Sequence, residues 1–298
     1  MFRSIIFFAV FLCVNGEGKF DPTKVDYCKL KCNKLKSTGC DCKQRGTRSE
    51  ILEKMIEFRQ LCVDYHNYWR NFLASGNETR GFAKPAANMV VMNYDMELEY
   101  LARCWGRGLF NGYHDKCRLM SNGKRAGQNI AGVNVKDPSM NRVKIGIRVA
   151  WYDEVKDMQE DIYEKLNSVE KYNIGHFTAM CWWSANRVGC ARIYTADTKK
   201  EKFIHPIYVT ALICNYCTKD LKGVINLING RMYIQGPACT KCPEGEKYNK
   251  CNKNFTSLCG ELEPVPTEKE WDFDKAKAPK HKSFPIVIFI GLLVVCLF

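Results

Sequence analysis

The pattern of hydrophobic and polar positions predicts two core strands. Residues 175–183 alternate so that apolar side chains lie on both faces of an extended segment, which is typical of a strand buried on two sides. Residues 207–216 have the same character. His176 lies at the start of the first run. Two interpretations are open for it: a partly buried ring bonded to a backbone carbonyl, or a ligand or acid/base role. We therefore expect a buried sheet with a histidine at its edge.

Apolar residues at alternating steps of four and three predict a first helix over residues 51–72. Thr47 and Glu50 have the spacing of a capping box before it, and Gly76 follows its end. The pattern therefore predicts a helix that begins near Thr47.

Two more helices are expected downstream. The apolar face of one extends over residues 98–109, and the other spans roughly residues 141–156. In the latter, Glu154 lies on the apolar stripe. A buried carboxylate needs a partner, so Glu154 should meet an arginine, a hydrogen-bond donor or a metal.

Both ends of the chain are apolar. Residues 1–16 have an early positive charge, a short apolar run and a small residue near a cleavage point, which indicates a signal peptide and an exported chain. Residues 284–298 carry no charge but are short for a membrane span. We rank a GPI-attachment signal or a short terminal anchor, on the outer cell surface, above free secretion.

The cysteine count agrees with export. Two of the seventeen cysteines, Cys13 and Cys296, lie in the terminal apolar segments, which leaves fifteen. In an exported protein these are mainly disulfides, with zinc–thiolate sites as the minor alternative. Because fifteen is odd, one thiol should remain unpaired.

The formal net charge of +13 indicates attraction to anionic surfaces such as sulphated glycans or lipid headgroups. The lysines over residues 19–43 and 199–202 have the pattern of solvated faces. No nucleic-acid-binding motif is present, so we expect no nucleic acid partner.

Composition divides the exported chain into four parts before the tail. Residues 17–48 form a cysteine-rich N-terminal extension, 49–217 a main domain, 218–260 a second cysteine-rich segment and 261–283 a polar, stalk-like linker. Asn77 and Asn254 begin glycosylation sequons and are expected in exposed loops. Cys239 and Cys242 could be a zinc half-site or a redox pair, but no matching half is present.

Several motifs resemble those of the CAP superfamily, which comprises cysteine-rich secretory proteins, antigen 5 and pathogenesis-related proteins. The extension resembles that of insect venom allergen 5 proteins, and residues 217–259 resemble the hinge of cysteine-rich secretory proteins. The motifs are 175–183, His66-Asn67-x-x-Arg70, the loop 112–117, Gly127-Gln128-Asn129 and the closing Cys214-Asn215-Tyr216. The resemblance implies an α+β fold: a three-layer α/β/α sandwich with an antiparallel sheet and disulfide-rich extensions.

The resemblance also implies disulfide pairs. These are Cys28 with Cys40, Cys32 with Cys117, and Cys190 with Cys214. The family's partner for Cys42 falls near Leu109, so Cys104 or Cys62 must substitute. Cys62 or Cys181 is then expected to be the free thiol.

Members of the superfamily keep a cleft with two histidines and two glutamates. The matching positions here are His114, Gln128, Glu154 and His176. Two neutral imidazoles could hold zinc, with Glu154 orienting a water or a ring. Gln128 is neutral and cannot act as a general base, so a hydrolytic set is incomplete. His66 is expected to brace the fold.

We therefore expect a non-enzymatic extracellular or cell-surface protein that requires no cofactor. It would bind a small apolar ligand such as a sterol or fatty acid, or an extracellular protein partner. The alternatives are a metal-dependent hydrolase, disfavoured by Gln128, and a channel-modulating secreted toxin. The latter is disfavoured because the five cysteines between Cys214 and the apolar tail are too few for a hinge and a channel domain.

Overall fold

The structure is a computed structural model and describes residues 19–169, 173–197, 199, 208–221 and 223–273. Its centre is a five-stranded sheet in which the main path runs β3–β6–β7–β5, all antiparallel, while β4 pairs with β6 in parallel. The strands are β3 (Arg48–Glu50), β4 (Asn93–Tyr94), β5 (Gly127–Val133), β6 (Arg187–Thr195) and β7 (Thr210–Cys217).

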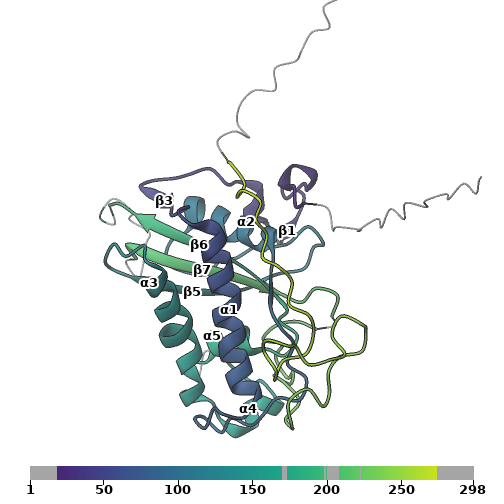
Figure 1. The fold of residues 1–298 in the computed structure, drawn as a ribbon. Coiled ribbons are helices and arrows are strands. Elements are labelled where there is room, and N and C mark those ends of the chain that lie inside the picture. Colours follow the sequence, from purple (N-terminus) through teal and green to yellow (C-terminus); the bar gives the residue numbers. More distant parts are fainter. Residues whose placement is uncertain (1–18, 170–172, 198, 200–207, 222, 274–298) are drawn as a thin grey trace, which may run out of the picture.

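Helices cover both faces of this sheet (Figure 1). One face carries α1, α3, α5 and the helical turns that continue α3, whereas α2 and its continuation η3 pack on the other. This arrangement confirms the α+β, three-layer prediction. The bounds are α1 (Met55–Ala74), α2 (Met96–Cys104), η3 (Trp105–Leu109), α3 (Met140–Ile145), η4 (Gly146–Trp151), η5 (Tyr152–Asp157), α4 (Glu160–Glu164) and α5 (Gly175–Cys181).

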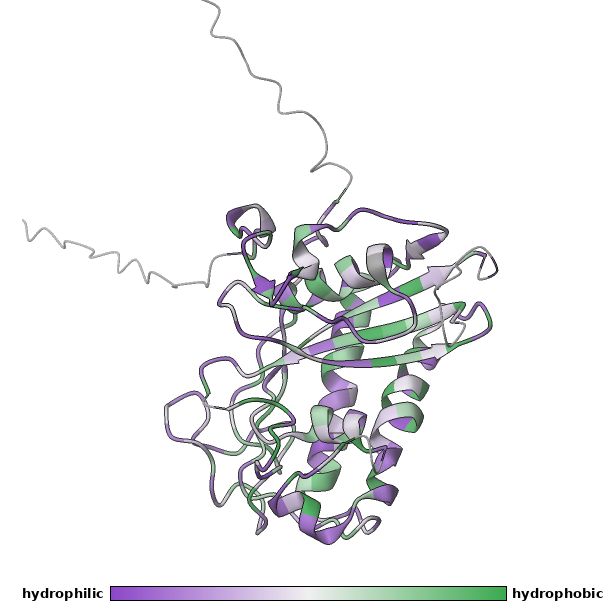
Figure 2. Cartoon of the chain, turned by 180° about the vertical axis from the view of Figure 1, so that it is seen from behind, coloured by the Kyte–Doolittle hydropathy of each residue, from purple (hydrophilic) through white to green (hydrophobic). Residues whose placement is uncertain are grey.

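The core lies on both sides of the sheet, and every residue of β7 is buried. Figure 2 shows apolar residues along the strands and on the helices packed against them. A strand with helices on both faces needs apolar side chains at successive positions, which is why residues 210–217 are mainly apolar, with only Thr210 and Asn215 polar. The expected strand at 207–216 is thus confirmed from Thr210 onward.

The expected strand at 175–183 is wrong, because residues Gly175–Cys181 form the helix α5. Residues Phe177 to Cys181 are all buried, so this helix is apolar all round. A short apolar run of this kind has no periodicity that separates a buried strand from a buried helix. The Glu154 carboxylate decides the outcome, because its Oε2 accepts hydrogen bonds from the His176 and Phe177 backbone N–H groups in the first turn.

The first helix begins later than expected. Thr47 and Glu50 do not cap it, because Arg48–Glu50 form strand β3 on the edge of β6, and α1 starts at Met55. The Glu50 carboxylate instead pairs with Arg103 and Arg107. The Glu50 carboxylate therefore binds buried arginines and does not form the capping box that its spacing from Thr47 predicted.

The His66, Asn67 and Arg70 motif braces α1 against the rest of the domain, as expected for His66. Asn67 exchanges two hydrogen bonds of 2.8 Å with the Met92 backbone. The Arg70 guanidinium is fully buried and donates to the carbonyls of Val90, Met180, Trp182 and Trp183. His66 lies between the Cys62 carbonyl and the Tyr216 hydroxyl, away from any cleft.

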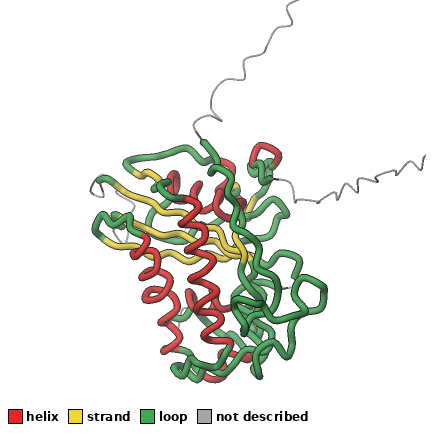
Figure 3. The backbone as a smooth tube through the Cα atoms, viewed as in Figure 1, coloured by secondary structure: helices red, strands yellow, loops and turns green. Residues whose placement is uncertain are grey.

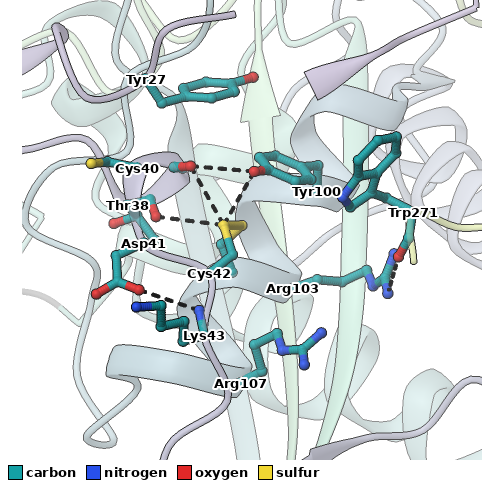
Figure 4. Close-up of a disulfide and its surroundings, with 12 residues drawn as sticks. Tyr27, Thr38, Cys40, Asp41, Cys42, Lys43, Tyr100, Arg103, Arg107 and Trp271 are labelled. Carbon is teal, nitrogen blue, oxygen red and sulfur yellow. Dashed lines mark hydrogen bonds between the residues drawn. A yellow bond between two sulfur atoms is a disulfide. The ribbon is translucent and has the colours of Figure 1, made fainter. Parts of the chain in front are cut away.

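Six disulfides lie in the described residues. They include the three pairs that the resemblance implies, and Cys42 pairs with Cys104. Figure 4 shows the Cys42 bridge, with Tyr100 beside it and Arg103 next to the Trp271 carbonyl. The remaining two are Cys239–Cys251 and Cys242–Cys259. Among the fifteen cysteines that the structure describes, three thiols are free and buried, Cys62, Cys181 and Cys217, whereas the odd count predicted one.

The chain after β7 is irregular throughout its described part and lies along the side of the domain (Figure 3). The expectation of a stalk for residues 261–273 is wrong. Glu263 pairs with Arg187 and Lys247, and Arg59 donates to the carbonyls of Pro266 and Glu268. We call residues 261–273 the C-terminal strap. Its polar composition reflects ion pairs and hydrogen bonds with buried arginines.

The expected signal peptide and apolar tail lie outside the described residues. Within the described part of the chain, no helix has the length and apolar character needed to cross a bilayer.

Candidate functional site

The four expected cleft residues surround one cavity of about 1050 Å³. Helix α5 contributes His176, the helical turn η5 contributes Glu154, strand β5 contributes Gln128, and the loop before β5 contributes His114. The site therefore forms where the first turn of α5 meets the start of β5, at one end of the sheet.

The His176 ring is held by Glu154. Its Nδ1 lies 2.6 Å from Glu154 Oε1, while Glu154 Oε2 accepts the two backbone N–H groups of α5. A carboxylate that accepts three hydrogen bonds at this point orients the ring and leaves the Nε2 lone pair for another group. The partner that sequence reasoning required for Glu154 is thus the start of α5.

The His114 ring is held by Gln128. Gln128 Oε1 accepts from the Asp115 backbone N–H at 2.9 Å, and its Nε2 donates to Asn215 Oδ1 at 3.0 Å. These two bonds fix the amide orientation, so the His114 Nδ1 that lies 3.1 Å from Gln128 Oε1 must be the protonated nitrogen. The Nε2 lone pair of His114 is then also free for another group.

The two rings lie 6.3 Å apart between centroids. Burial, opposed by the bond to Gln128 and reinforced by nearby Arg118, lowers the pKa of His114, which favours its neutral form. When neutral, two imidazoles whose Nδ1 atoms are bonded to Gln128 and Glu154 form a donor set that suits zinc. Gln128 offers no base, and Glu154 accepts the first backbone N–H groups of α5, so these two side chains hold the His114 and His176 rings.

The rim of this cleft has two chemical characters. Arg118, Lys124 and Arg125 lie on the side of the loop before β5. The lining also includes four apolar residues from the segments before α5 and after β7, Val169, Val224, Ile225 and Leu227.

A second cavity, of about 170 Å³, lies between α3 with η4 and the edges of β5 and β7. Sequence reasoning missed it, because it is made by residues that are distant in the chain. Its apolar lining includes Val133, Val143, Ile145, Val149 and Leu212.

Two polar groups belong to this apolar cavity. Asp137 and Arg142 form an ion pair of 2.9 Å and are each partly exposed. Arg192 is 5% exposed and donates to the Pro138 and Glu53 carbonyls. Its Nε has no hydrogen-bond partner among the described residues. Of the residues that the structure describes, Arg192 is thus the one buried charged side chain that lines this mainly apolar cavity.

Other predicted positions lie apart from both cavities. Asn77 and Asn254 are exposed, as a glycosylated asparagine must be. Cys239 and Cys242 are in separate disulfides, so they offer no thiolate pair for zinc. Burial raises the pKa of the Cys181 thiol to about 12, which makes it a poor nucleophile.

Comparison with known proteins identifies the family. Residues 63–216 match the model of the CAP, Cysteine-rich secretory protein family. Venom allergen 5 2 of Polybia paulista is 31% identical over 205 residues, which cover 64% of this chain and 92% of that protein. Venom allergen 5 of Polistes dominula is 33% identical over 204 residues, covering 64% of this chain and 84% of the relative.

Two solved structures share the fold. The crystal structure of NaASP2 with Zn2+ has a TM-score of 0.51 at 23% identity and covers 68% of this chain and 95% of its own. The crystal structure of Na-ASP-1 has a TM-score of 0.52 at 22% identity, covering 68% of this chain and 47% of its own. By its family model, its relatives and its fold, this chain belongs to the CAP family of cysteine-rich secretory proteins.

Proposed function

We propose that this protein is a non-enzymatic, exported CAP protein that binds an acyl chain in the cavity beside α3. The cavity is the observation that carries the proposal. Its volume of about 170 Å³ resembles that of engineered apolar cavities of about 150 Å³ that bind benzene. It therefore suits part of a fatty acyl chain better than a whole sterol nucleus.

Export and surface attachment complete the proposal. The signal-like residues 1–16, the six disulfides and a family described as secretory support an extracellular site. The uncharged residues 284–298 support attachment to the outer cell surface. The absence of a base at Gln128 and the use of Glu154 as a cap support a binding role over the hydrolase alternative.

The acyl-chain proposal can be tested by fluorescence. Dansyl-labelled undecanoate should bind the full-length protein and be displaced by palmitate. Ile145→Trp fills the cavity, and losing contact with about two methylene groups should weaken binding roughly tenfold. Lys144→Trp is the control, because its side chain lies over the Tyr65 ring on the other side of α3. Absent binding, or equal losses in both variants, would reject the proposal.

A second proposed role is zinc binding in the histidine cleft, favoured by the two free Nε2 positions. His114 and His176 would hold the ion, which would supply Lewis acidity or a structural link there. Calorimetric titration of the full-length protein with zinc should show one site, and His114→Ala/His176→Ala should abolish it. Binding that survives in the double variant would place the ion elsewhere.

Gln128→Glu should tighten zinc binding roughly tenfold, because a carboxylate raises the basicity of the histidine that it holds. The same change should cost about 1–3 kcal/mol of folding free energy, since a carboxylate oxygen would then face Asn215 Oδ1. Titration calorimetry and thermal unfolding measure the two effects. Unchanged zinc affinity would show that His114 is not a ligand.

A further inference from the structure

The N-terminal extension carries a hairpin in which two positively charged residues face each other. Strands β1 (Lys31–Cys32) and β2 (Leu35–Lys36) pair so that Lys31 lies directly opposite Lys36. Like charges in such a cross-strand pair are destabilising. Lys34, in the turn between the strands, is also exposed, and none of these three lysines has an ion-pair partner among the described residues. Lys29, just before β1, pairs with Asp26.

Covalent and hydrogen bonds hold this hairpin in place despite the repulsion. Cys32 is bonded to Cys117, and Cys28 to Cys40. Ser37 Oγ donates to the Leu119 carbonyl at 3.0 Å, and the Thr38 N–H donates to the Cys117 carbonyl at 2.9 Å. The backbone that carries the lysines is therefore held in place before an anion binds. Binding would then cost little conformational entropy of this backbone.

The same links place a second group of cations beside the hairpin. Lys116, Arg118, Lys124 and Arg125 lie in or near the segment that Cys117 ties to Cys32, and the last three also line the histidine cleft. Arg118 Nε is buried without a hydrogen-bond partner among the described residues. Burial, with repulsion from the nearby charge of Arg125 adding to it, lowers the pKa of Arg118 to about 10.

Two acids near this surface have other partners. The Glu97 carboxylate accepts hydrogen bonds from the Tyr27 hydroxyl and from Ser121. Asp115 is buried beneath the surface that carries the cations, and its carboxylate accepts the Cys117 backbone N–H at 2.8 Å. We call the seven cations Lys31, Lys34, Lys36, Lys116, Arg118, Lys124 and Arg125 the basic band.

We propose that the basic band binds a sulphated polysaccharide, which runs from the hairpin to the mouth of the histidine cleft. A flexible polyanion can contact successive cations along a band, and its binding relieves the Lys31–Lys36 repulsion. A sulphated glycan is favoured over anionic lipid because the anionic lipids of a plasma membrane face the cytosol, whereas this chain is exported. The choice of glycan rests on the export part of the proposed function, but the acyl-chain and zinc sites do not enter it.

The test uses heparin octasaccharide and the full-length protein in surface plasmon resonance at several salt concentrations. The wild type should bind with an affinity that falls steeply with salt, and completely desulphated heparin should not bind. Lys31→Gln/Lys34→Gln/Lys36→Gln should weaken binding roughly ten- to hundredfold and flatten the salt dependence by about three charges. Lys124→Gln/Arg125→Gln should give a smaller loss in the same direction.

The matched control is Lys241→Gln/Lys250→Gln/Lys253→Gln, which removes the same charge from exposed lysines after β7. It should leave heparin affinity within about twofold. If both triple variants lost the same heparin affinity, the net charge of the protein alone would explain binding, and the proposal would be overturned. So would binding to phosphatidylserine vesicles without binding to heparin.

The hairpin triple variant also has a readout that separates binding from misfolding. Because it removes the Lys31–Lys36 repulsion, it should unfold at the same temperature as the wild type or higher. A large fall in its unfolding temperature, with heparin binding restored by Lys31→Arg/Lys34→Arg/Lys36→Arg, would still support the band. If the arginine variant unfolds like the wild type but fails to bind, the proposal is wrong.

Discussion

Arg59→Met should lower the free energy of unfolding by about 3–5 kcal/mol. The Arg59 guanidinium is fully buried and forms two hydrogen bonds, of 2.7 and 3.0 Å, with the buried Glu99 carboxylate. Removing the arginine leaves the carboxylate buried without its main partner, which is more costly than losing one contact. Urea unfolding followed by circular dichroism measures the change.

Arg231→Met is the matched control. Arg231 pairs with Glu164 at 2.8 Å, but the two side chains are 53% and 46% exposed. A pair in water contributes at most about 1 kcal/mol, so this variant should stay near the wild type. If the two variants differed by less than about 1 kcal/mol, the Arg59–Glu99 pair would not be buried in solution.

The same Arg59 change should release the C-terminal strap. Arg59 donates to the Pro266 carbonyl at 2.9 Å and to the Glu268 carbonyl at 2.6 Å, so methionine would leave both without their donor. Limited proteolysis should cut residues 261–273 faster in this variant than in the wild type or in Arg231→Met. Equal cutting rates would show that other contacts, such as Glu263 with Arg187, hold the strap.

Lowering the pH from 6.5 to 4 should cost about 3 kcal/mol of stability through His66 alone. Burial, with the positive charge of Arg70 adding to it and the Cys62 carbonyl opposing it, lowers the pKa of His66 to about 4. In the unfolded chain His66 is protonated near pH 6.5, whereas in the folded protein it is protonated only near pH 4. The contribution is thus complete above pH 6.5 and is lost as the pH falls through this window.

His66→Gln tests this assignment, because an amide does not titrate in this range. The variant should lose most of the pH dependence of unfolding between pH 6.5 and 4, even though its stability at neutral pH is lower. His114→Gln is the comparison: the pKa of His114 is lowered too, but the residue is exposed at the cleft, so this variant should reduce the pH dependence less than His66→Gln does. A His66→Gln variant that keeps the wild-type slope would contradict the role of His66.

Glu263 has a separate acid window. Its bonds to Arg187 and Lys247 outweigh burial, which would raise its pKa, and hold that pKa at about 2. The stability that these pairs contribute is present above the ordinary glutamate pKa and is lost progressively as the pH falls from there to about 2. We therefore assign a loss of stability on acidification above pH 4.5 to histidine. We assign a loss of strap contacts below pH 4.5 to Glu263.

The sequence by itself determined the family, the layered fold and the residues around the cleft. Short motifs such as His66-Asn67-x-x-Arg70 carry polar side chains that must form hydrogen bonds when they are buried. Motifs of this kind in the same order along the chain therefore indicate the same contacts in the fold. The sequence also indicated that Glu154 needs a partner, because a carboxylate on an apolar stripe cannot be left unpaired.

Only the tertiary structure decided local form wherever a distant group completes an element. Residues 175–181 form a helix because Glu154 caps their first turn, and residues 48–50 form a strand because β6 offers an edge. The polar segment 261–273 lies on the domain because Arg59 and Arg187 meet it. Periodicity reads only neighbours in the chain, whereas these outcomes depend on hydrogen bonds between residues far apart in it.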